Sequence, residues 1–545
     1  MRPRTPESNH GKNQFRTLFL IGLILHVCAA WFNEGYFHPD EHFQVLEFGA
    51  YKLEQAPAAD LAWEFNAKIR PAIQPALVFV IHRALHWVGG ANPFFLAFIF
   101  RLLSALLGLT VATALCRQGI QHLKAAGSQT LLILSTFLFY ANPLLHARFS
   151  SENWGGIFLF GGLVLLQIIA DPPPGGARSL GVALGAGLAF GTAFWCRFQI
   201  GFSLVGIGLW LLLIRRIPWS NAAAILLGFL LACGSNLAID HWFYNEWVLT
   251  PVRYFVTNIV AGKAAQFGIQ PWYYYFLQLL ALLIPPYSLL FLILIGGACI
   301  RFRQQLLVWA VVPFFFGHCL VAHKESRFLF PMIYAFPLLT AWGADALIRW
   351  WQPWITSRPG RVAVKILATL NLILLVFFTV RPTEDSVLIY RWMTQQGKAG
   401  PYPLYTFRQN PYQQRRRQPP PDCRPTSESV APPRPSSAVT TLPTMHYYAT
   451  DQVTLVPVDE AADLVKIVHA AVQPVYVFCE GFAIPPELLS PALRWTVATQ
   501  TFPAWLRHFN INHWQERSRI WNIYRCSLAE PVPGTQNQPT ESAPR

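Results

Sequence analysis

Long apolar runs separated by short polar segments dominate this chain of 545 residues. A helix that crosses a bilayer needs about 20 mainly apolar residues. Runs of about this length recur near 15–32, 94–116, 128–146, 154–170, 179–195, 198–214, 219–239, 274–299, 305–321, 328–348 and 363–380. The pattern therefore predicts a multi-pass α-helical membrane protein with about eleven spans in the body 15–380.

Two longer polar connections, 33–93 and 240–273, interrupt this body. In the first, apolar residues recur at helical spacing from Pro39 onward,. Proline suits the first position of a helix, so we expect a helix to begin there. The second connection is rich in Trp and Tyr, which favour the membrane interface.

The pattern changes after the last apolar run. Residues 381–444 are rich in Pro, Ser, Gln and Arg and are expected to form a linker without a packed core. Residues 445–528 return to mixed patterning and predict a small α/β domain. Its expected elements are strands at 452–458 and 475–478 and a helix at 461–471. The tail 529–545 is expected to be disordered.

Composition and charge refine this interpretation. The chain is 53% apolar and 13% charged, with a formal net charge of +15. Its basic residues lie mostly in short segments between apolar runs, where they orient helices, and no basic domain suggests nucleic acid as a partner. The basic segment 1–14 predicts a cytoplasmic N-terminus, with the first run as an uncleaved anchor. Alternation then places both long connections and everything after the last span outside.

The cysteines give little further information. Six of the nine lie in or near the apolar runs, where free Cys acts as a small apolar residue. Cys423, Cys479 and Cys526 lie in the outer tail. One disulfide among them is possible, but its pairing cannot be read from the sequence.

Polar residues gather at the segments assigned outside, and the first cluster is His38-Pro39-Asp40-Glu41-His42. Two adjacent carboxylates that open a helix against a membrane are candidates for general-base chemistry, because each raises the pKa of the other. Alternatively, they only complement the helix dipole. Metal binding by the two histidines is disfavoured, since proline disturbs the turn between them and no third ligand is near. We therefore expect neither a metal nor another cofactor.

The second cluster is His323-Lys324-Glu325-Ser326-Arg327, between two apolar runs. Lys324 and Arg327 could clamp a phosphate, or the cluster could be an ordinary interfacial charge group. Glu325 would pair with one of the bases in either case.

Arg197 lies between two apolar runs with almost no loop around it, where an unpaired charge is costly. It is either a second phosphate ligand or the ion-pair partner of Glu152. The group Ser150–Asn153 could equally cap a helix. A single site requires Asp40, Arg197, Lys324 and Arg327 to lie around one cavity.

The motifs resemble those of a known family. His38-Pro-Asp-Glu-His-Phe-Gln-Val-Leu-Glu-Phe48, Asp240-His-Trp-Phe-Tyr-Asn-Glu-Trp247, Gly268-Ile-Gln-Pro-Trp272 and His323-Lys-Glu-Ser-Arg-Phe328 are similar, in order, to signatures of glycosyltransferase family 22, the lipid-linked mannosyltransferases. The match is greatest to the glycosylphosphatidylinositol mannosyltransferase 3 type. The resemblance implies a GT-C fold with the catalytic acid in the first outer loop.

The resemblance also implies a reaction. The donor would be a dolichyl or polyprenyl phosphate β-mannose, and mannose would pass with inversion to a glycolipid or lipid-linked glycan, for a GPI-type enzyme through an α-1,2 linkage. Asp40 would be the base, assisted by Glu41, and Lys324, Arg327, His323 and Arg197 would hold the donor. Acceptor-binding or structural roles are expected for His38, His42, Glu152, Asp240 and Trp272.

The acceptor and the host membrane stay open. The segments Ser150–Asn153 and Arg197-Phe198-Gln199 match the eukaryotic pattern loosely, and Arg outnumbers Lys by 33 to 9, so the chain could also be a bacterial relative that acts on a different glycolipid. The membrane would be that of the endoplasmic reticulum in a eukaryote and the inner membrane in a bacterium. The residues are also compatible with a GT-C transferase that uses a different lipid-phosphate sugar or a protein acceptor, and with a lipid or sugar transporter.

Overall fold

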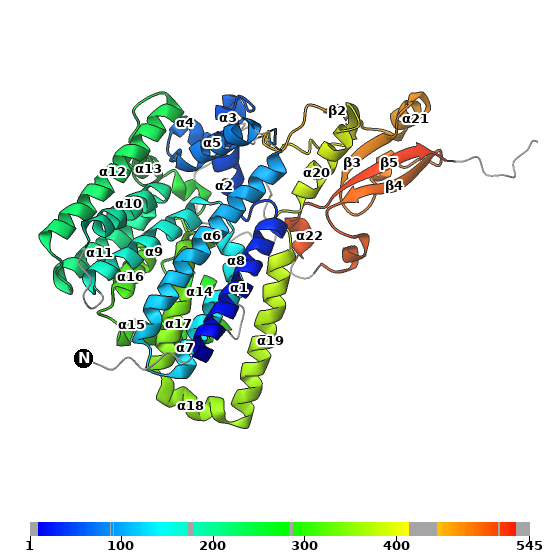
Figure 1. Ribbon diagram of the computed structural model, residues 1–545. Helices are drawn as coiled ribbons and strands as arrows, with labels where there is room; N and C mark the ends of the chain where they lie inside the picture. Colours follow the sequence, from blue (N-terminus) through cyan, green and yellow to red (C-terminus); the bar gives the residue numbers. More distant parts are fainter. Residues whose placement is uncertain are drawn as a thin grey trace, which may run out of the picture. The chain divides into compact units, whose positions relative to one another are not determined.

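The computed structural model describes residues 9–87, 89–90, 92–172, 179–282, 287–413, 444–510 and 513–529. The chain divides into two compact units, Met1–Glu384 and Asp385–Arg545. The first unit is helical, and the second is built on a five-stranded sheet (Figure 1). Of the sequence-based predictions, three parts lie outside the described residues: the segment 1–8, the part of the expected linker at 414–443 with Cys423, and the tail 530–545.

The helical unit consists of long helices joined by short ones. Its α-helices are α1 (Asn9–Phe32), α2 (Pro39–Glu41), α3 (Glu47–Lys52), α4 (Trp63–Ala67), α5 (Ile73–Trp87), α6 (Pro93–Gly119), α7 (Ala126–Leu138), α8 (Ala141–His146), α9 (Ser151–Ala170), α10 (Leu180–Cys196), α11 (Gly201–Leu213), α12 (Trp219–Tyr244), α13 (Thr250–Phe255), α14 (Tyr274–Leu282), α15 (Tyr287–Arg301), α16 (Leu306–Leu320), α17 (Phe336–Ala346), α18 (Ile348–Thr356) and α19 (Arg358–Val380). Short 3₁₀ or π turns lie at His42–Leu46, Ala58–Asp60, Ile120–His122, Phe198–Ile200, Val256–Val260, Ala264–Phe267 and Ser326–Tyr334.

The long apolar helices fit a multi-pass membrane protein. Among the described residues, five helices are long and apolar enough to cross a bilayer, and the turn Ser326–Tyr334 with α17, bent by 70°, makes up to six. Five further apolar helices are shorter, at 10–17 residues. Helices thus occur at each apolar run, which confirms the predicted class. The count of eleven spans and the sidedness stay predictions.

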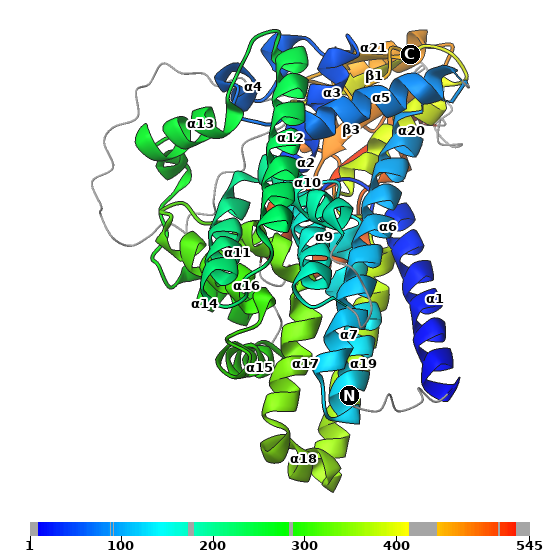
Figure 2. The same cartoon turned by 60° about the vertical axis from the view of Figure 1, so that its left-hand side comes forward.

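Small residues allow close packing inside the body. Helix α10 packs between α9 and α12, and Figure 2 shows α10 beside α12. A Cβ on Gly187 of α10 would lie 2.0 Å from the carbonyl oxygen of Ile225, and a Cβ on Gly228 of α12 would lie 2.2 Å from that of Leu184. Such small-residue contacts let helix backbones approach in the absence of a hydrophobic driving force.

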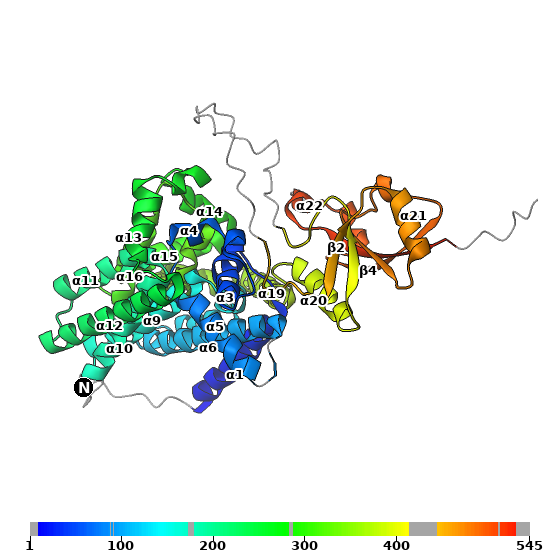
Figure 3. The same cartoon turned by 90° about the horizontal axis from the view of Figure 1, so that it is seen from above.

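The first connection forms a layer of short helices, α2 to α5, at one end of the bundle (Figures 1 and 3). The carboxylate of Asp240 at the end of α12 anchors this layer. It accepts hydrogen bonds from Ala72 N at 2.7 Å, Trp195 Nε1 at 3.0 Å and Thr250 Oγ1 at 2.7 Å. The start of α5 is thereby fixed to α10, α12 and α13.

The second unit is a small α/β domain, as the sequence predicts. Its elements are α20 (Ser386–Gly397), β1 (Tyr402–Thr406), β2 (Val453–Pro457), α21 (Ala461–Ala470), β3 (Val475–Glu480), β4 (Leu493–Gln500), α22 (Trp514–Arg517) and β5 (Trp521–Leu528), with 3₁₀ turns at Pro486–Leu488 and Ala504–His508. The strand order is β2-β1-β3-β5-β4. β1 pairs in parallel with β2 and β3, whereas β5 is antiparallel to β3 and β4.

This domain begins earlier in the chain than the sequence predicted. We expected residues 381–444 to be an unpacked linker, but they contribute α20 and the interior strand β1. The sequence concealed β1 because Pro403 lies in its middle, and proline argues against an interior strand. Leu404 of this strand is fully buried. Cys479 and Cys526, two candidates for a disulfide, are buried free thiols.

Candidate active site

A short helical turn positions the first acidic pair. The residue His38 has extended backbone angles and caps α2, and its Nδ1 accepts a hydrogen bond from Asp40 N at 3.2 Å. Pro39 occupies the first helical position, as the sequence predicts. The chain continues as a π turn into α3. Asp40 and Glu41 therefore lie in the first turn of a helix, at the end of the bundle where α2 to α5 gather.

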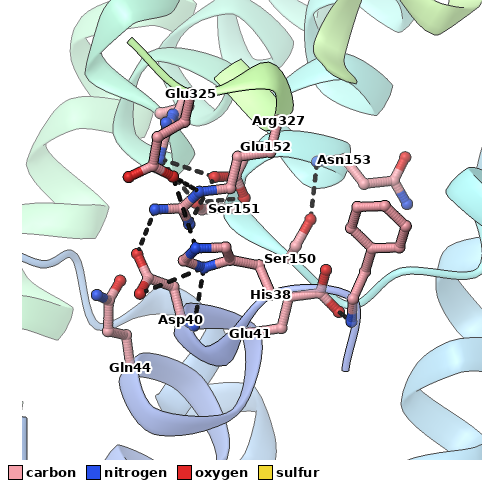
Figure 4. Close-up of polar contacts among 12 residues, drawn as sticks. His38, Asp40, Glu41, Gln44, Ser150, Ser151, Glu152, Asn153, Glu325 and Arg327 are labelled. Atoms are coloured by element: carbon pink, nitrogen blue, oxygen red, sulfur yellow. Dashed lines mark hydrogen bonds and ion pairs between the residues drawn. The ribbon is translucent and has the colours of Figure 1, made fainter. Parts of the chain in front are cut away.

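Arg327 links the first acidic pair to distant parts of the chain. Its Nη2 lies 2.7 Å from Asp40 Oδ2, its Nη1 3.2 Å from Glu152 Oε1 and its Nε 2.5 Å from Glu325 Oε2. Figure 4 shows the guanidinium group among these three carboxylates. The sequence offered Arg327 as a phosphate ligand or as part of an ordinary interfacial charge group, and the structure places it directly against Asp40.

Arg197 forms a second connection to the same carboxylate of α9. Its Nη1 lies 3.0 Å from Glu152 Oε1, and the guanidinium lies 4.8 Å from the centre of the Phe328 ring. The ion pair that the sequence offered as one of two interpretations is therefore present. Among the described residues, Nε and Nη2 of Arg197 have no hydrogen-bond partner although the side chain is only 4% exposed, so the guanidinium keeps unused donors. The hydroxyl of Ser150 accepts from Asn153 N at 3.2 Å and caps α9, which agrees with the cap interpretation.

Two further arginines escaped the sequence analysis. Arg70 Nη2 lies 3.4 Å from Asp40 Oδ2 and 3.6 Å from Glu64 Oε1. The side chain of Arg148 is 1% exposed, and its Nη1 lies 3.9 Å from Glu41 Oε2. An arginine inside an acid-rich loop was the available signal for Arg70. Arg148 is close to the end of an apolar run, where an unpaired charge would also be costly.

The surrounding charges give the two neighbouring carboxyl groups different pKa values. Burial alone would raise the pKa of Asp40, but the charges of Arg327 and Arg70, together with contact to His38, hold it well below its usual range. Burial raises the pKa of Glu41 to about 6, since Arg148 compensates only in part. Asp40 is thus firmly ionised, whereas Glu41 titrates near neutral pH.

Other residues singled out from the sequence lie in different settings. Lys324 is 5% exposed, and its Nζ donates to backbone carbonyls of Gln270, at 3.0 Å, and of Val321. His323 contacts Glu325 at 2.9 Å through Nε2, and the hydrogen bond to that carboxylate raises the pKa of His323. His42 Nε2 contacts Glu47 Oε1 at 2.6 Å in the buried interior.

Two of the candidates named for acceptor or structural roles can be placed in the same way. Asp240 is the anchor described above. Trp272 is 64% exposed and packs edge-on against Tyr273 and Phe276. The roles assigned to all these side chains from the sequence stay predictions.

A pocket beside the cluster contains about 480 Å³ of space, part of it open to solvent. Its walls include Asp40, Glu41, Arg70, Gln74, Glu152 and Arg197. Of the four residues that a single site requires, Asp40 and Arg197 line this pocket, whereas Lys324 and Arg327 are not among its lining residues. Arg327 lies beside the pocket through its ion pair with Asp40. In the described part of the chain, no three His, Cys, Asp or Glu side chains are arranged to hold a metal ion.

Comparison with known proteins places this cluster in a family. Residues 17–402 match the model of the Alg9-like mannosyltransferase family. The chain belongs to this family. The match covers most of the helical unit and every motif of the cluster, and it confirms the resemblance to glycosyltransferase family 22.

Two curated relatives illustrate the similarity to other Alg9-like mannosyltransferases. A probable Dol-P-Man:Man(7)GlcNAc(2)-PP-Dol alpha-1,6-mannosyltransferase of Schizosaccharomyces pombe is 36% identical over 155 residues, 28% of this chain and 27% of that protein. GPI mannosyltransferase 3 of Aspergillus fumigatus is 24% identical over 455 residues, 73% of this chain and 58% of that protein. The chain therefore spans about a quarter and somewhat over half of these relatives.

A solved structure supports the fold. ArnT from Cupriavidus metallidurans, in a crystal structure bound to undecaprenyl phosphate, aligns with a TM-score of 0.51 and 13% identity over 94% of this chain and 98% of that chain. At this identity the likeness concerns the fold. It confirms the predicted GT-C architecture of the Alg9-like family member.

Proposed function

We propose that this protein is an inverting mannosyltransferase. It moves mannose from a dolichyl or polyprenyl phosphate β-mannose to a hydroxyl group of a glycolipid or lipid-linked glycan, on the non-cytoplasmic face of its membrane. For a GPI-type acceptor the new linkage is α-1,2. The observation that carries the proposal is the ion pair between Asp40 and Arg327, beside a pocket whose walls include Asp40 and Arg197.

Asp40 is the proposed general base. It opens a helix, lies at the wall of the pocket and is held ionised by its neighbours. In the transfer the acceptor oxygen attacks C1 of mannose, its proton passes to the Asp40 carboxylate, and the bond from C1 to the phosphate oxygen breaks. The lipid phosphate leaves with the electron pair of that bond. General-base catalysis contributes about 10²–10⁴-fold to such a rate.

Arg327 and Arg197 are the proposed stabilisers of the departing phosphate, with His323 and Lys324 nearby in sequence. Fixed cations aimed at a developing negative charge lower the barrier without reorganising during the reaction. Arg327 already contacts three carboxylates, so a phosphate bound to it competes with Asp40 for the same guanidinium. Weaker pairing raises the pKa of Asp40 and makes it a stronger base. Binding of the donor thereby prepares the proton acceptor.

The test is transfer in vesicles that contain the purified full-length protein, a polyprenyl phosphate mannose donor and candidate glycolipid acceptors. Asp40→Asn should lower kcat by about 10²–10⁴-fold. It is measured at a temperature at which the variant is folded, because loss of the ion pair with Arg327 also lowers thermal stability,. Asp60→Asn, a second loop aspartate that does not line the pocket, is the matched control and should retain activity. Equal rates for wild type and Asp40→Asn would remove Asp40 as the base. Mannolipid that crosses the vesicle without a new glycosidic bond would identify a transporter instead.

A further inference from the structure

Several polar atoms around the pocket are buried and lack partners. Gln74, in the first turn of α5, is 3% exposed, and its Nε2 has no hydrogen-bond partner among the described residues. The same holds for Nε of Arg70 and for Nε and Nη2 of Arg197. All three side chains line the pocket. A buried donor without a partner costs about 1–3 kcal/mol, so these groups are arranged for a ligand that supplies acceptor atoms.

The pocket also supplies acceptors. Asp40 and Glu41 line it together with these donors. A phosphate can accept from Arg197 but has no hydrogen to donate to Asp40 and Glu41, and a hydrocarbon chain would leave every polar group unsatisfied. Hydroxyl groups both donate and accept. A ligand with several hydroxyl groups, such as a hexose ring, therefore satisfies both kinds of wall at once.

A third polar wall comes from elements far away in the sequence. The Nε2 of Gln199, after α10, donates to the hydroxyl of Tyr254 of α13 at 2.6 Å, and both residues line the pocket. The guanidinium of Arg70 lies 5.9 Å from the centre of the Tyr254 ring. These contacts hold this wall in place, so its polar groups are positioned before a ligand enters.

We infer that Gln74 determines sugar specificity in this pocket by donating a hydrogen bond to one ring hydroxyl of the bound hexose. The inference rests on the proposed function, because the hexose is either the transferred sugar of the donor or the terminal sugar of the acceptor. Gln74 lies on a regular helix whose start is tied to Asp240 through Ala72 N. Its amide is therefore held at a fixed place in the pocket wall.

The experiment compares Gln74→Met with wild type in the same vesicles, on intact substrates and on two series of deoxy analogues. One series lacks single hydroxyls of the donor mannose, and the other lacks single hydroxyls of the acceptor's terminal sugar. In wild type, removal of the recognised hydroxyl should lower kcat/KM about tenfold, the worth of one hydrogen bond. Gln74→Met should lose about tenfold on the intact sugar and show no further loss on that analogue.

The series in which the loss disappears identifies the bound sugar. Gln118→Met removes a half-buried glutamine of α6, which donates to Val164 O at 2.9 Å away from the pocket, and it should retain the full discrimination. Gln74→Asn keeps the amide but withdraws it by one methylene, and serves if Gln74→Met does not fold. Discrimination that persists in the Gln74 variants for both series would overturn the inference. Absence of any transfer by wild type would instead refute the proposed function.

Discussion

The contrast between Asp40 and Glu41 leads to a prediction about stability. Glu41 is 9% exposed, and burial raises its pKa from 4.5 to about 6. A pKa difference of this size corresponds to about 2 kcal/mol, at 1.36 kcal/mol per pKa unit. The folded protein bears this cost whenever the carboxyl group is ionised. Glu41→Gln removes the charge and keeps an oxygen that can accept from Phe37 N, which donates to Glu41 Oε2 at 3.2 Å.

The sign follows from proton linkage. Between pH 4.5 and about 6 the folded state binds more protons at Glu41 than the unfolded state, so stability falls as the pH rises through this window,. The cost is absent below pH 4.5 and complete above about pH 7. The variant should therefore gain about 2 kcal/mol over wild type at pH 8 and nothing at pH 4.5.

Thermal unfolding of the purified protein in detergent, followed by tryptophan fluorescence between pH 4.5 and 8, measures this difference. The Tm of Glu41→Gln should exceed that of wild type at pH 8, and the two curves should converge toward pH 4.5. Glu54→Gln, an exposed loop position, should follow wild type throughout. A gain that is the same at every pH would contradict the charge-burial explanation. A loss of stability at pH 8 would show that the interaction with Arg148 outweighs burial.

Two further substitutions probe the cluster and the helix packing. Arg327→Met leaves three carboxylates without their shared cation and should lower the free energy of unfolding by about 3–5 kcal/mol, as breaking a buried pair does. Arg327→Lys should fold but lose transfer activity, because one ammonium cannot replace the forked guanidinium. Unfolding midpoints and transfer rates distinguish the two variants. Gly228→Ala should destabilise by about 1–3 kcal/mol, because its Cβ would lie 2.2 Å from a backbone oxygen of α10, whereas Gly234→Ala in the same helix meets nothing within 4 Å and should leave the Tm unchanged.

Local patterns were sufficient for the elements and for one half of the cluster. The apolar runs predicted the helices, and His38-Pro39-Asp40 predicted a helix start because capping and proline preferences depend on neighbouring residues alone. β1 escaped because its place inside the sheet depends on strands about 50 and 70 residues later in the chain. Pro403 gave the opposite local signal.

The partners of the charged residues were harder to predict from the sequence. The pair between Arg197 and Glu152 could be anticipated, since each lies at an end of neighbouring helices, α10 and α9, that follow each other in the chain. The partners of Lys324, in contrast, could not be predicted. The sequence suggested a phosphate ligand, whereas its ammonium donates to two backbone carbonyls, and backbone acceptors leave no trace in a motif.

The charge balance of the cluster explains why it is built from such distant segments. Asp40, Glu152 and Glu325 are brought together on α2, α9 and the turn before α17, and none could be buried near the others without a shared cation. Arg327 supplies that cation, so assembly of the cluster and folding of the body require each other. A ligand that contacts Arg327 therefore acts on all three carboxylates at once. This coupling makes the ion pair with Asp40 the contact through which a bound phosphate would change the strength of the proposed base.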